Sequence, residues 1–353
     1  MSNTNKHQHY DLKQMQSLPL EAKIVMTQQR IRQWYDHWDG NVYVSFSGGK
    51  DSTVLKHIVD NTPGVHDVPA VFVNTGLEYP EIQKFVKDIK AGKWDCFNPN
   101  VEIVRPDMRF DEVLKVYGYP VISKRVAGYI ATAKRNPDSQ RARWIRGDDW
   151  TKFVAGGKYT YLIDSPFPIS DQCCNVMKKK PAKKYAHETG RKPMTGQMAC
   201  ESVSRENMWM KQGCNGFNMK EPISNPMSFW TEQDVLHYIK KFDVPYASVY
   251  GDIVSVDAEG NKYELLPQDM ETFGTFGVMP TLETTGCSRT GCIFCIFGCH
   301  REKEPNRFQR MKETHPRQYE FCINGGETVD GKWQPSKEGL GLGKVLDYIG
   351  VKY

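Results

Sequence analysis

Apolar residues follow a helical period and then a strand-like run near the start of the chain. Between residues 20 and 38 they recur at steps of three, four and seven, at Leu20, Ile24, Ile31, Tyr35 and Trp38. This spacing predicts an amphipathic helix with one packed face. A β-prone apolar run over residues 42–46 then predicts a strand, and renewed helical spacing predicts a helix over residues 52–60.

The alternation of strands and helices continues along the chain. Apolar runs predict strands at residues 70–73, 101–104 and 192–196, and helical spacing over residues 82–89 predicts a helix that stops near Gly92. A further helix is predicted over residues 229–239, with Thr231 as its N-cap. These elements predict an α/β fold with a doubly wound parallel sheet, whose ligands lie at the carboxyl ends of the strands.

Three parts are expected along the sequence: a tail and helix in residues 1–40, an α/β nucleotide-binding domain in 41–250, and an insertion with a cysteine-rich C-terminal region in 251–353. Residues 252–285 are rich in turns and are interpreted as inserted. Residues 118–174 are irregular and basic, and we expect substrate loops there.

Two basic stretches accompany this pattern. Each fits either a solvated helix face or phosphate recognition, and the sequence leaves both open. The first contains Lys124, Arg125, Lys134, Arg135, Arg141, Arg143 and Arg146, and the second contains Lys178, Lys179, Lys180, Lys183, Lys184, Arg191 and Lys192.

Composition narrows the class of protein. The chain has 353 residues and 39% hydrophobic content, enough for a sizeable core, so a disordered chain is excluded. It has no apolar run of membrane-spanning length and no secretory signal pattern, so we expect a cytoplasmic protein without a membrane partner. The 47 Lys and Arg residues against 42 acidic ones favour anionic ligands only modestly.

The predicted strand at 42–46 and the following helix are joined by a glycine-rich turn, Ser47-Gly48-Gly49-Lys50-Asp51-Ser52. Such a turn lets backbone N–H groups approach phosphate oxygens at a helix N-terminus. Lys50 would neutralise phosphate charge, while Asp51 would bind Mg²⁺ or cap the helix. The spacing is not that of a Walker A loop. It resembles the SGGxDS signature of PP-loop ATP pyrophosphatases, which cleave ATP between the α and β phosphates.

The ten cysteines are clustered. Cys173 and Cys174 are adjacent, and Cys292-x-x-Cys295 forms a second pair, flanked by Cys287 and Cys299. Two adjacent thiolates suit two irons of one cluster better than one small ion. A structural zinc site and unliganded buried thiols remain alternatives. The two pairs resemble the CC…CxxC motif that binds a 4Fe-4S cluster in adenylyl-sulfate reductases, which implies these four ligands, with Cys287 and Cys299 as substitutes.

Further motifs, in the expected order from Lys23 to Cys299, resemble the phosphoadenosine phosphosulfate reductase family. They are Thr75-Gly76-Leu77-Glu78-Tyr79-Pro80, then Thr195-Gly196 with Glu201-Ser202 and Arg205, then Pro226 with Trp230-Thr231 and Asp234-Val235. The loop and this resemblance together make Lys50, Asp51 and Arg205 the catalytic candidates. The nucleotide-binding candidates are Ser45, Ser47, Gly48, Gly49, Lys50, Asp51, Ser52, Thr75, Gly76, Glu78, Thr195, Gly196, Glu201 and Ser202.

Departures from the reductase pattern guide the functional expectation. The reductases attack their sulfonucleotide with the cysteine of a C-terminal Glu-Cys-Gly tail, whereas no cysteine follows Cys322 here. Lys50 is present in a loop that is usually degenerate in the reductases, and Met198 replaces the arginine of the phosphate motif. We therefore expect an enzyme that binds ATP with Mg²⁺, adenylates an acceptor and uses a 4Fe-4S cluster in sulfur transfer.

The sequence does not identify the partners. A sulfur donor or thiol reductant is expected, and the acceptor is a nucleic acid or a small metabolite. The alternatives are a sulfonucleotide reductase that releases sulfite, with Cys299 or Cys287 as its thiol, and a non-catalytic module that binds nucleotide or nucleic acid. Monomer and homodimer both remain open.

Overall fold

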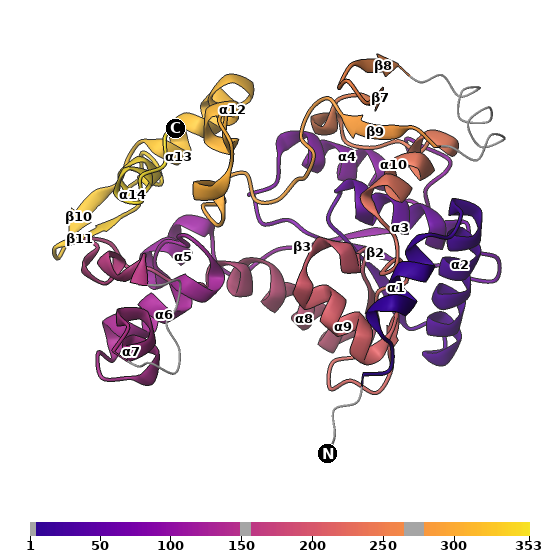
Figure 1. The fold of residues 1–353 in the computed structure, drawn as a ribbon, viewed down its shortest axis with the longest axis horizontal. Coiled ribbons are helices and arrows are strands. Elements are labelled where there is room, and N and C mark those ends of the chain that lie inside the picture. Colours follow the sequence, from indigo (N-terminus) through magenta and orange to yellow (C-terminus); the bar gives the residue numbers. More distant parts are fainter. Residues whose placement is uncertain (1–4, 149–156, 265–278) are drawn as a thin grey trace. The chain divides into compact units, whose positions relative to one another are not determined.

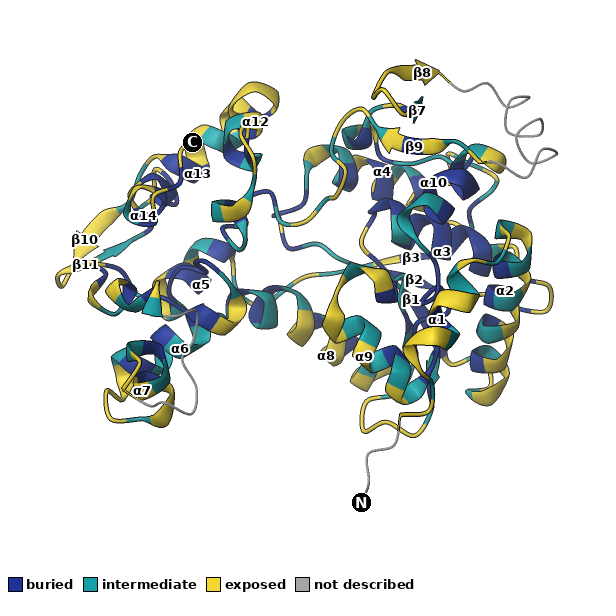
Figure 2. Ribbon diagram, viewed as in Figure 1, coloured by how far each residue is buried: buried dark blue, intermediate teal, exposed yellow. Residues whose placement is uncertain are grey.

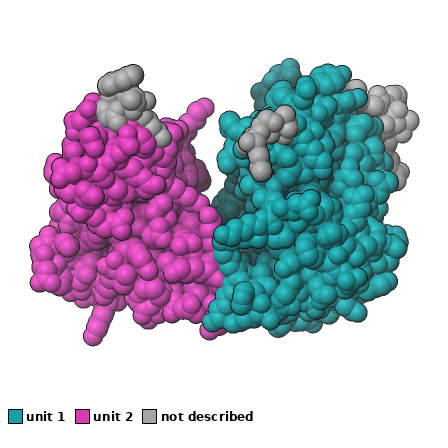
Figure 3. Space-filling view, turned by 90° about the horizontal axis from the view of Figure 1, so that it is seen from below, with its two compact units in different colours: residues 1–74, 78–104, 182–291 teal, residues 75–77, 105–181, 292–353 magenta. Residues whose placement is uncertain are grey.

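The computed structural model describes residues 5–148, 157–264 and 279–353. The chain forms two compact units, each built from separate stretches of sequence (Figure 3). The first unit contains residues 1–74, 78–104 and 182–291, and the second contains residues 75–77, 105–181 and 292–353. The chain therefore passes between the units several times.

The first unit is organised around a six-stranded sheet with the strand order β3-β2-β1-β4-β6-β5 (Figure 1). All neighbouring strands are parallel except the edge pair β5 and β6. This sheet confirms the predicted α/β class with a mostly parallel central sheet. The strands are β1 (Val42–Phe46), β2 (Ala70–Val73), β3 (Val101–Val104), β4 (Lys192–Met194), β5 (Asn215–Gly216) and β6 (Ile223–Ser224).

Side chains of the central strand point alternately to two covered faces. Val42, Val44 and Phe46 lie in the main hydrophobic core with apolar residues of the surrounding helices. Tyr43 packs on the other face against Tyr185 of α8 (Lys180–Thr189), with their ring centroids 5.2 Å apart. This period of two places β1 between two apolar layers, which explains its continuous apolar sequence.

Four helices of the first unit, α2, α3, α4 and α10, match the predicted ones closely, whereas α1, α8 and α9 are not predicted by the sequence. α2, α3 and α10 pack against one another, and their buried faces are visible in Figure 2. The Thr231 hydroxyl accepts a hydrogen bond from the Asp234 amide at the start of α10, as expected for an N-cap. The helices are α1 (His9–Gln16), α2 (Leu20–His37), α3 (Lys50–Asp60), α4 (Pro80–Lys90), α9 (Val203–Gln212) and α10 (Glu232–Lys241), with most of α8 (Lys180–Thr189).

The turn-rich stretch interpreted as inserted contains a small sheet of its own. Its strands β7 (Ile253–Val256), β8 (Lys262–Glu264) and β9 (Thr281–Thr284) are antiparallel, with β7 in the centre. Residues 265–278 of this stretch lie outside the described residues. The sheet is joined to the main body through α10, because Gln233 exchanges two hydrogen bonds with Leu282.

The second unit is mainly helical. Its helices are α5 (Phe110–Tyr117), α6 (Lys124–Arg135), α7 (Gln140–Arg146), α12 (Arg307–Thr314), α13 (Pro316–Ile323) and α14 (Leu342–Tyr348), and its hairpin pairs β10 (Glu327–Val329) with β11 (Lys332–Gln334). The expectation of irregular structure in residues 118–174 is wrong for the part covered by α6 and α7. Serines cap both helices, since Ser123 accepts from the Val126 amide and Ser139 from the Ala142 amide.

Within the described residues, no helix has the length and apolar character needed to cross a membrane.

Candidate functional site

The glycine-rich loop lies where the sequence predicts it, between the end of β1 and the start of α3. Gly48 adopts a φ of 71°, a left-handed conformation that glycine reaches without strain. A Cβ at this position would lie 2.8 Å from a methyl carbon of Ile82 and 2.9 Å from one of Val86. The loop therefore depends on glycine for both its turn and its packing against α4.

Serine side chains stabilise the loop through hydrogen bonds within it. The Ser47 amide donates to the Ser52 hydroxyl at 3.2 Å, and the two serine hydroxyls lie 3.0 Å apart. The Gly49 amide donates to Ser47 Oγ at 3.3 Å. These bonds fix the turn at the N-terminus of α3, where backbone N–H groups and the helix dipole favour an anion.

Lys50 is enclosed by first-unit residues that are distant in sequence. Its side chain is only 3% exposed, and its ammonium lies 2.9 Å from Oε1 of Glu232 and 3.7 Å from Oδ1 of Asp51. It also donates to the Ser288 carbonyl at 2.8 Å. The Lys50 backbone amide donates to the Tyr250 hydroxyl at 3.1 Å. Carboxylate, carbonyl and hydroxyl oxygens thus surround the two groups that would meet a phosphate.

Asp51 is the buried carboxylate of the loop. Burial raises its pKa, while the positive charges of Lys50, Arg289 and Arg205 act in the opposite direction. Among the described side chains, its Oδ1 atom is buried without a hydrogen-bond partner. A buried carboxylate oxygen that accepts no hydrogen bond, and whose nearest cation is the Lys50 ammonium at 3.7 Å, fits a ligand of Mg²⁺, which prefers oxygen donors.

An arginine pair lies beside the loop, joined by one carboxylate. Glu201 forms ion pairs with Arg205 and with Arg289, whose Nη2 lies 2.9 Å from Oε1 of Glu201. The second carboxylate oxygen of Glu201 also accepts from the Met198 amide at 2.8 Å. Glu201 therefore positions two guanidinium groups, each of which is able to bind a phosphate in bidentate fashion.

Other predicted residues have clear structural contacts. Gly196 lies against the loop, since a Cβ there would be 2.9 Å from the Asp51 carbonyl oxygen. Thr195 donates from its hydroxyl to Oδ1 of Asn225 at 2.5 Å. Ser202 caps α9 by accepting from the Arg205 amide at 3.3 Å. Ser45 lies within β1, opposite Val71 of β2.

The segment after β2 is divided between the units. Thr75 and Gly76 belong to the second unit and the buried Glu78 to the first. Thr75 Oγ1 accepts from the Leu77 amide at 3.1 Å, which tightens the turn. The Leu77 carbonyl accepts from the Ile293 amide at 2.7 Å. This bond joins the Thr75–Leu77 turn to the Cys292-x-x-Cys295 segment within the second unit.

Cys173 and Cys174 precede a π-helical turn at Asn175–Lys179, with their sulfur atoms 3.9 Å apart. A hydrogen bond from Cys173 lowers the pKa of Cys174 to about 6, with Lys124 and Lys178 also favouring the thiolate. The same hydrogen bond, with burial, raises the pKa of Cys173. The neighbouring lysines therefore favour a thiolate at Cys174, whereas burial favours the protonated thiol at Cys173.

Cys292 and Cys295 belong to the same unit as the first pair, and both act electrostatically on Cys173. Arg307 supports their segment by donating to the Cys295 carbonyl at 2.9 Å. Cys299 is also in the second unit and is 1% exposed, whereas Cys287 belongs to the first unit. Across the part of the chain that the structure describes, no group of three or more His, Cys, Asp or Glu side chains is arranged to hold a metal ion.

Sequence patterns do not identify several residues of the loop environment. Glu232, Tyr250, Ser288 and Arg289 contact the loop or its neighbours from positions far along the chain. The sequence offers two signals: Glu232 lies between Thr231 and Asp234 of the predicted helix start, and Ser288 and Arg289 lie between Cys287 and Cys292. Tyr250 belongs to no recognisable motif. Its contact with the Lys50 amide therefore could not be predicted from the sequence.

Two known proteins are similar to this chain in sequence. An uncharacterized protein of Methanocaldococcus jannaschii is 32% identical over 130 residues, which are 36% of this chain and 25% of that protein. An adenosine 5′-phosphosulfate reductase of Oceanobacillus iheyensis is 23% identical over 227 residues, which are 63% of this chain and 71% of the relative. The chain thus spans about a quarter of the first relative and most of the second.

Among solved structures, the phosphate complex of phosphoadenylyl-sulfate reductase from Candida auris aligns with 66% of this chain and 91% of its own, at 18% identity and a TM-score of 0.38. The family model described as the phosphoadenosine phosphosulfate reductase domain matches residues 41–142 and 146–297, which is more than half of the chain. The protein therefore belongs to the phosphoadenosine phosphosulfate reductase family.

Proposed function

We propose that this protein binds ATP at the loop formed by residues 47–52 and cleaves it between the α and β phosphates to adenylate an acceptor. The observation that carries this proposal is the combination of a left-handed Gly48, amide groups at the start of α3, and the Lys50 cation in one loop. Such a loop binds the phosphates of a nucleotide through its backbone and one positive charge.

Each residue near the loop has a chemical role in this reaction. An acceptor oxygen forms a bond to the α-phosphorus while the bond to the bridging oxygen breaks, and pyrophosphate leaves. Lys50 and the loop amides stabilise negative charge on the phosphates, and Arg205 and Arg289 supply further cations. Asp51 would hold Mg²⁺, which would neutralise part of the triphosphate charge.

Ion pairs hold these cations in position before nucleotide binds. Lys50 is paired with Glu232, and the two arginines are paired with Glu201. A bound phosphate would replace the carboxylate as a partner of each cation. The side chains are thus oriented in advance, which lowers the ordering cost of binding.

The proposal includes sulfur transfer after adenylation, in which a sulfur donor displaces AMP from the activated acceptor. The chemistry of the donor set supports a 4Fe-4S cluster, because Cys173, Cys174, Cys292 and Cys295 lie in one unit and lysines favour the thiolate of Cys174. When bound, the cluster would supply a site for binding or relaying sulfur. A structural zinc ion is the alternative occupant of these thiols.

A second function is favoured by the relative from Oceanobacillus iheyensis, which is an adenosine 5′-phosphosulfate reductase. In this alternative, the loop and arginines bind the phosphate of a sulfonucleotide. A thiol attacks the sulfur and displaces the nucleotide phosphate, and the thiol reductant then cleaves the resulting S-sulfonate, which releases sulfite and leaves a disulfide. The same cations would bind this substrate, since a sulfonucleotide also presents anionic oxygens.

Product analysis separates these functions. Anaerobically purified protein is incubated with ATP and Mg²⁺ or with a sulfonucleotide and a thiol reductant, and pyrophosphate and sulfite are measured. Pyrophosphate release that is lost in Lys50→Gln, and kept in the exposed control Lys87→Gln, supports adenylation. Sulfite release without pyrophosphate release would establish the reductase instead. Nucleotide binding without either product would identify a non-catalytic module.

A further inference from the structure

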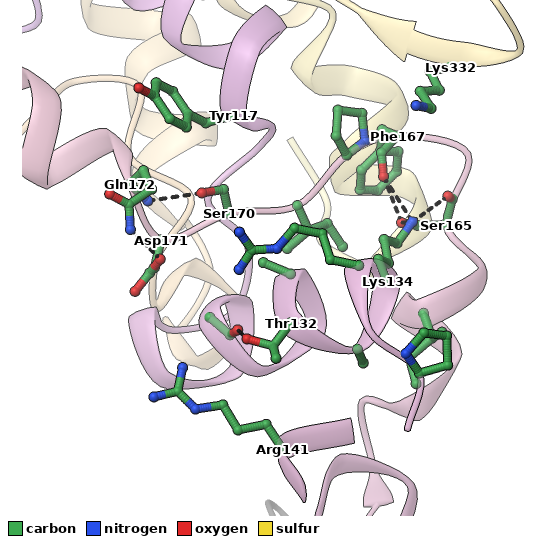
Figure 4. A pocket seen from close by; sticks show the side chains of 18 of the residues that line it. Tyr117, Thr132, Lys134, Arg141, Ser165, Phe167, Ser170, Asp171, Gln172 and Lys332 are labelled. Atoms are coloured by element: carbon green, nitrogen blue, oxygen red, sulfur yellow. Dashed lines mark hydrogen bonds between the residues drawn. The ribbon is translucent and has the colours of Figure 1, made fainter. Parts of the chain in front are cut away.

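A large pocket in the second unit is lined by residues that the adenylation chemistry does not use. Its volume is about 990 Å³, and α6, α7, the segment from Ser165 to Gln172 and the β10–β11 turn form its walls (Figure 4). This volume lies at the upper end for pockets that bind small ligands, so the pocket admits a ligand larger than a single small metabolite.

Among the charged side chains of the lining, cations outnumber carboxylates. The pocket is lined by Lys134, Arg135, Arg141, Arg146 and Lys332, whereas Asp171 is the single acidic residue among the described residues of the lining. Lys134 supports the wall, because its ammonium donates to the Ser165 carbonyl and hydroxyl and to the Phe167 carbonyl. The positive charge offered to a ligand therefore comes mainly from the three arginines and Lys332.

These cations are spread over the pocket rather than gathered at one point. Arg135 ends α6, Arg141 and Arg146 belong to α7, and Lys332 begins β11. In Figure 4, Arg141 and Lys332 lie at opposite ends of the lining side chains. Arg146 is oriented by hydrogen bonds to Asp148 and to the Pro137 carbonyl. A spread of this kind matches a chain of several phosphates better than one phosphate group.

Small residues keep the pocket open along α6. Gly128, Ala131 and Thr132 face it, and a Cβ on Gly128 would lie 3.2 Å from the Asp171 carboxylate. Aromatic surface is also present, since the half-buried Tyr117 lines the pocket. Aromatic rings beside cations are suited to stacked bases along a phosphate backbone.

The wall from Ser165 to Gln172 leads directly into Cys173, the first of the proposed cluster ligands. Gln172 is fixed at the pocket by hydrogen bonds from its amide to Ser170 Oγ and from its side chain to Asp171. Pocket and thiol pair thus belong to one unit and are joined by consecutive residues. A ligand in the pocket would lie near the sulfur chemistry that we propose.

We propose that this pocket binds a single-stranded nucleic-acid segment as the acceptor of the enzyme. Arg135, Arg141, Arg146 and Lys332 contact successive phosphates, and Tyr117 stacks on a base. The role as acceptor depends on the proposed function, whereas binding itself does not. A strand several nucleotides long explains the volume, the spread of charge and the aromatic lining together.

The test measures binding of a fluorescein-labelled ten-nucleotide single strand, as DNA and as RNA, by fluorescence anisotropy at several salt concentrations without ATP. The variant Arg135→Gln/Arg141→Gln removes two lining cations. Its matched control, Arg125→Gln/Arg143→Gln, removes two exposed arginines from the same two helices that do not line the pocket. Circular dichroism verifies that both variants retain their helices.

The pocket variant is expected to bind on the order of tenfold more weakly, and its log–log salt slope should be smaller by about 1.4, for two lost single-strand phosphate contacts. The control should bind like the parent. Equal weakening in both variants, no binding by the parent, or equally tight binding of inorganic phosphate would overturn the proposal. Pyrophosphate release from ATP is measured in parallel, so failure of adenylation is recognised separately from failure of strand binding.

Discussion

The ammonium of Lys50 lies 2.9 Å from the carboxylate of Glu232, the first residue of α10. The lysine is almost completely buried, whereas the Glu232 side chain is 45% exposed. This asymmetry means that the cation cannot leave the loop, while its partner can turn to solvent. Glu232 therefore competes with an incoming phosphate for the charge of Lys50.

Glu232→Gln should strengthen ATP binding, because the glutamine no longer neutralises Lys50. The pair is partly exposed to solvent and is worth no more than about 1 kcal/mol, so the dissociation constant should fall about two- to fivefold. Isothermal titration calorimetry with ATP and Mg²⁺ measures the change, and the exposed Glu188→Gln serves as control. Weaker binding in Glu232→Gln would show instead that the carboxylate assists the ligand.

Gly48→Ala should destabilise the protein, because alanine would be strained at a φ of 71° and its Cβ would collide with Ile82 and Val86. We expect a loss of about 1–3 kcal/mol in the free energy of unfolding, measured by urea denaturation. Gly92→Ala is the matched control, since Gly92 has a φ of 72° but a Cβ at that position would have no heavy atom within 4 Å. Equal losses in both variants would assign the whole effect to backbone strain.

The features that the sequence predicts well are local ones. The turn at Gly48 and the cap at Thr231 each depend on a few consecutive residues, and both are found in the structure. The helices α6 and α7 escape prediction because polar residues obscure their spacing, although Ser123 and Ser139 mark their starts. The Arg289–Glu201 ion pair joins residues 88 positions apart, so no local pattern reveals it.

Burial of His57 in α3 predicts a pH-dependent stability. Desolvation lowers its pKa from 6.5 to about 4, and Nδ1 lies 2.8 Å from the Tyr238 hydroxyl. Between these two values the unfolded chain binds a proton that the folded protein does not. This contribution to stability is therefore complete above pH 6.5 and is lost progressively as the pH falls toward 4.

His57→Gln should make the free energy of unfolding less dependent on pH between 6.5 and 4, because it removes the titrating group. Each unit of pKa difference corresponds to about 1.4 kcal/mol, so the change is measurable by urea denaturation at several pH values. The exposed His66→Gln should keep the pH dependence of the parent. An unchanged profile in His57→Gln would assign that dependence to other groups.

Cysteine replacement tests the proposed cluster ligands through metal content rather than activity. The protein purified without oxygen should contain iron and sulfide and absorb visible light, because a 4Fe-4S cluster is bound by four thiolates. Cys174→Ser and Cys292→Ser should lose most of the iron, since each removes one member of a pair, whereas Cys96→Ser should retain it because Cys96 belongs to the other unit.

A chelator such as bipyridyl should bleach the parent protein and leave its far-ultraviolet circular dichroism largely unchanged if the cluster is not needed for folding. A colourless parent that contains only zinc would replace the cluster with a structural zinc site. Full iron retention in both serine variants would exclude these two residues as ligands and direct attention to Cys299, a buried thiol of the same unit that flanks Cys295.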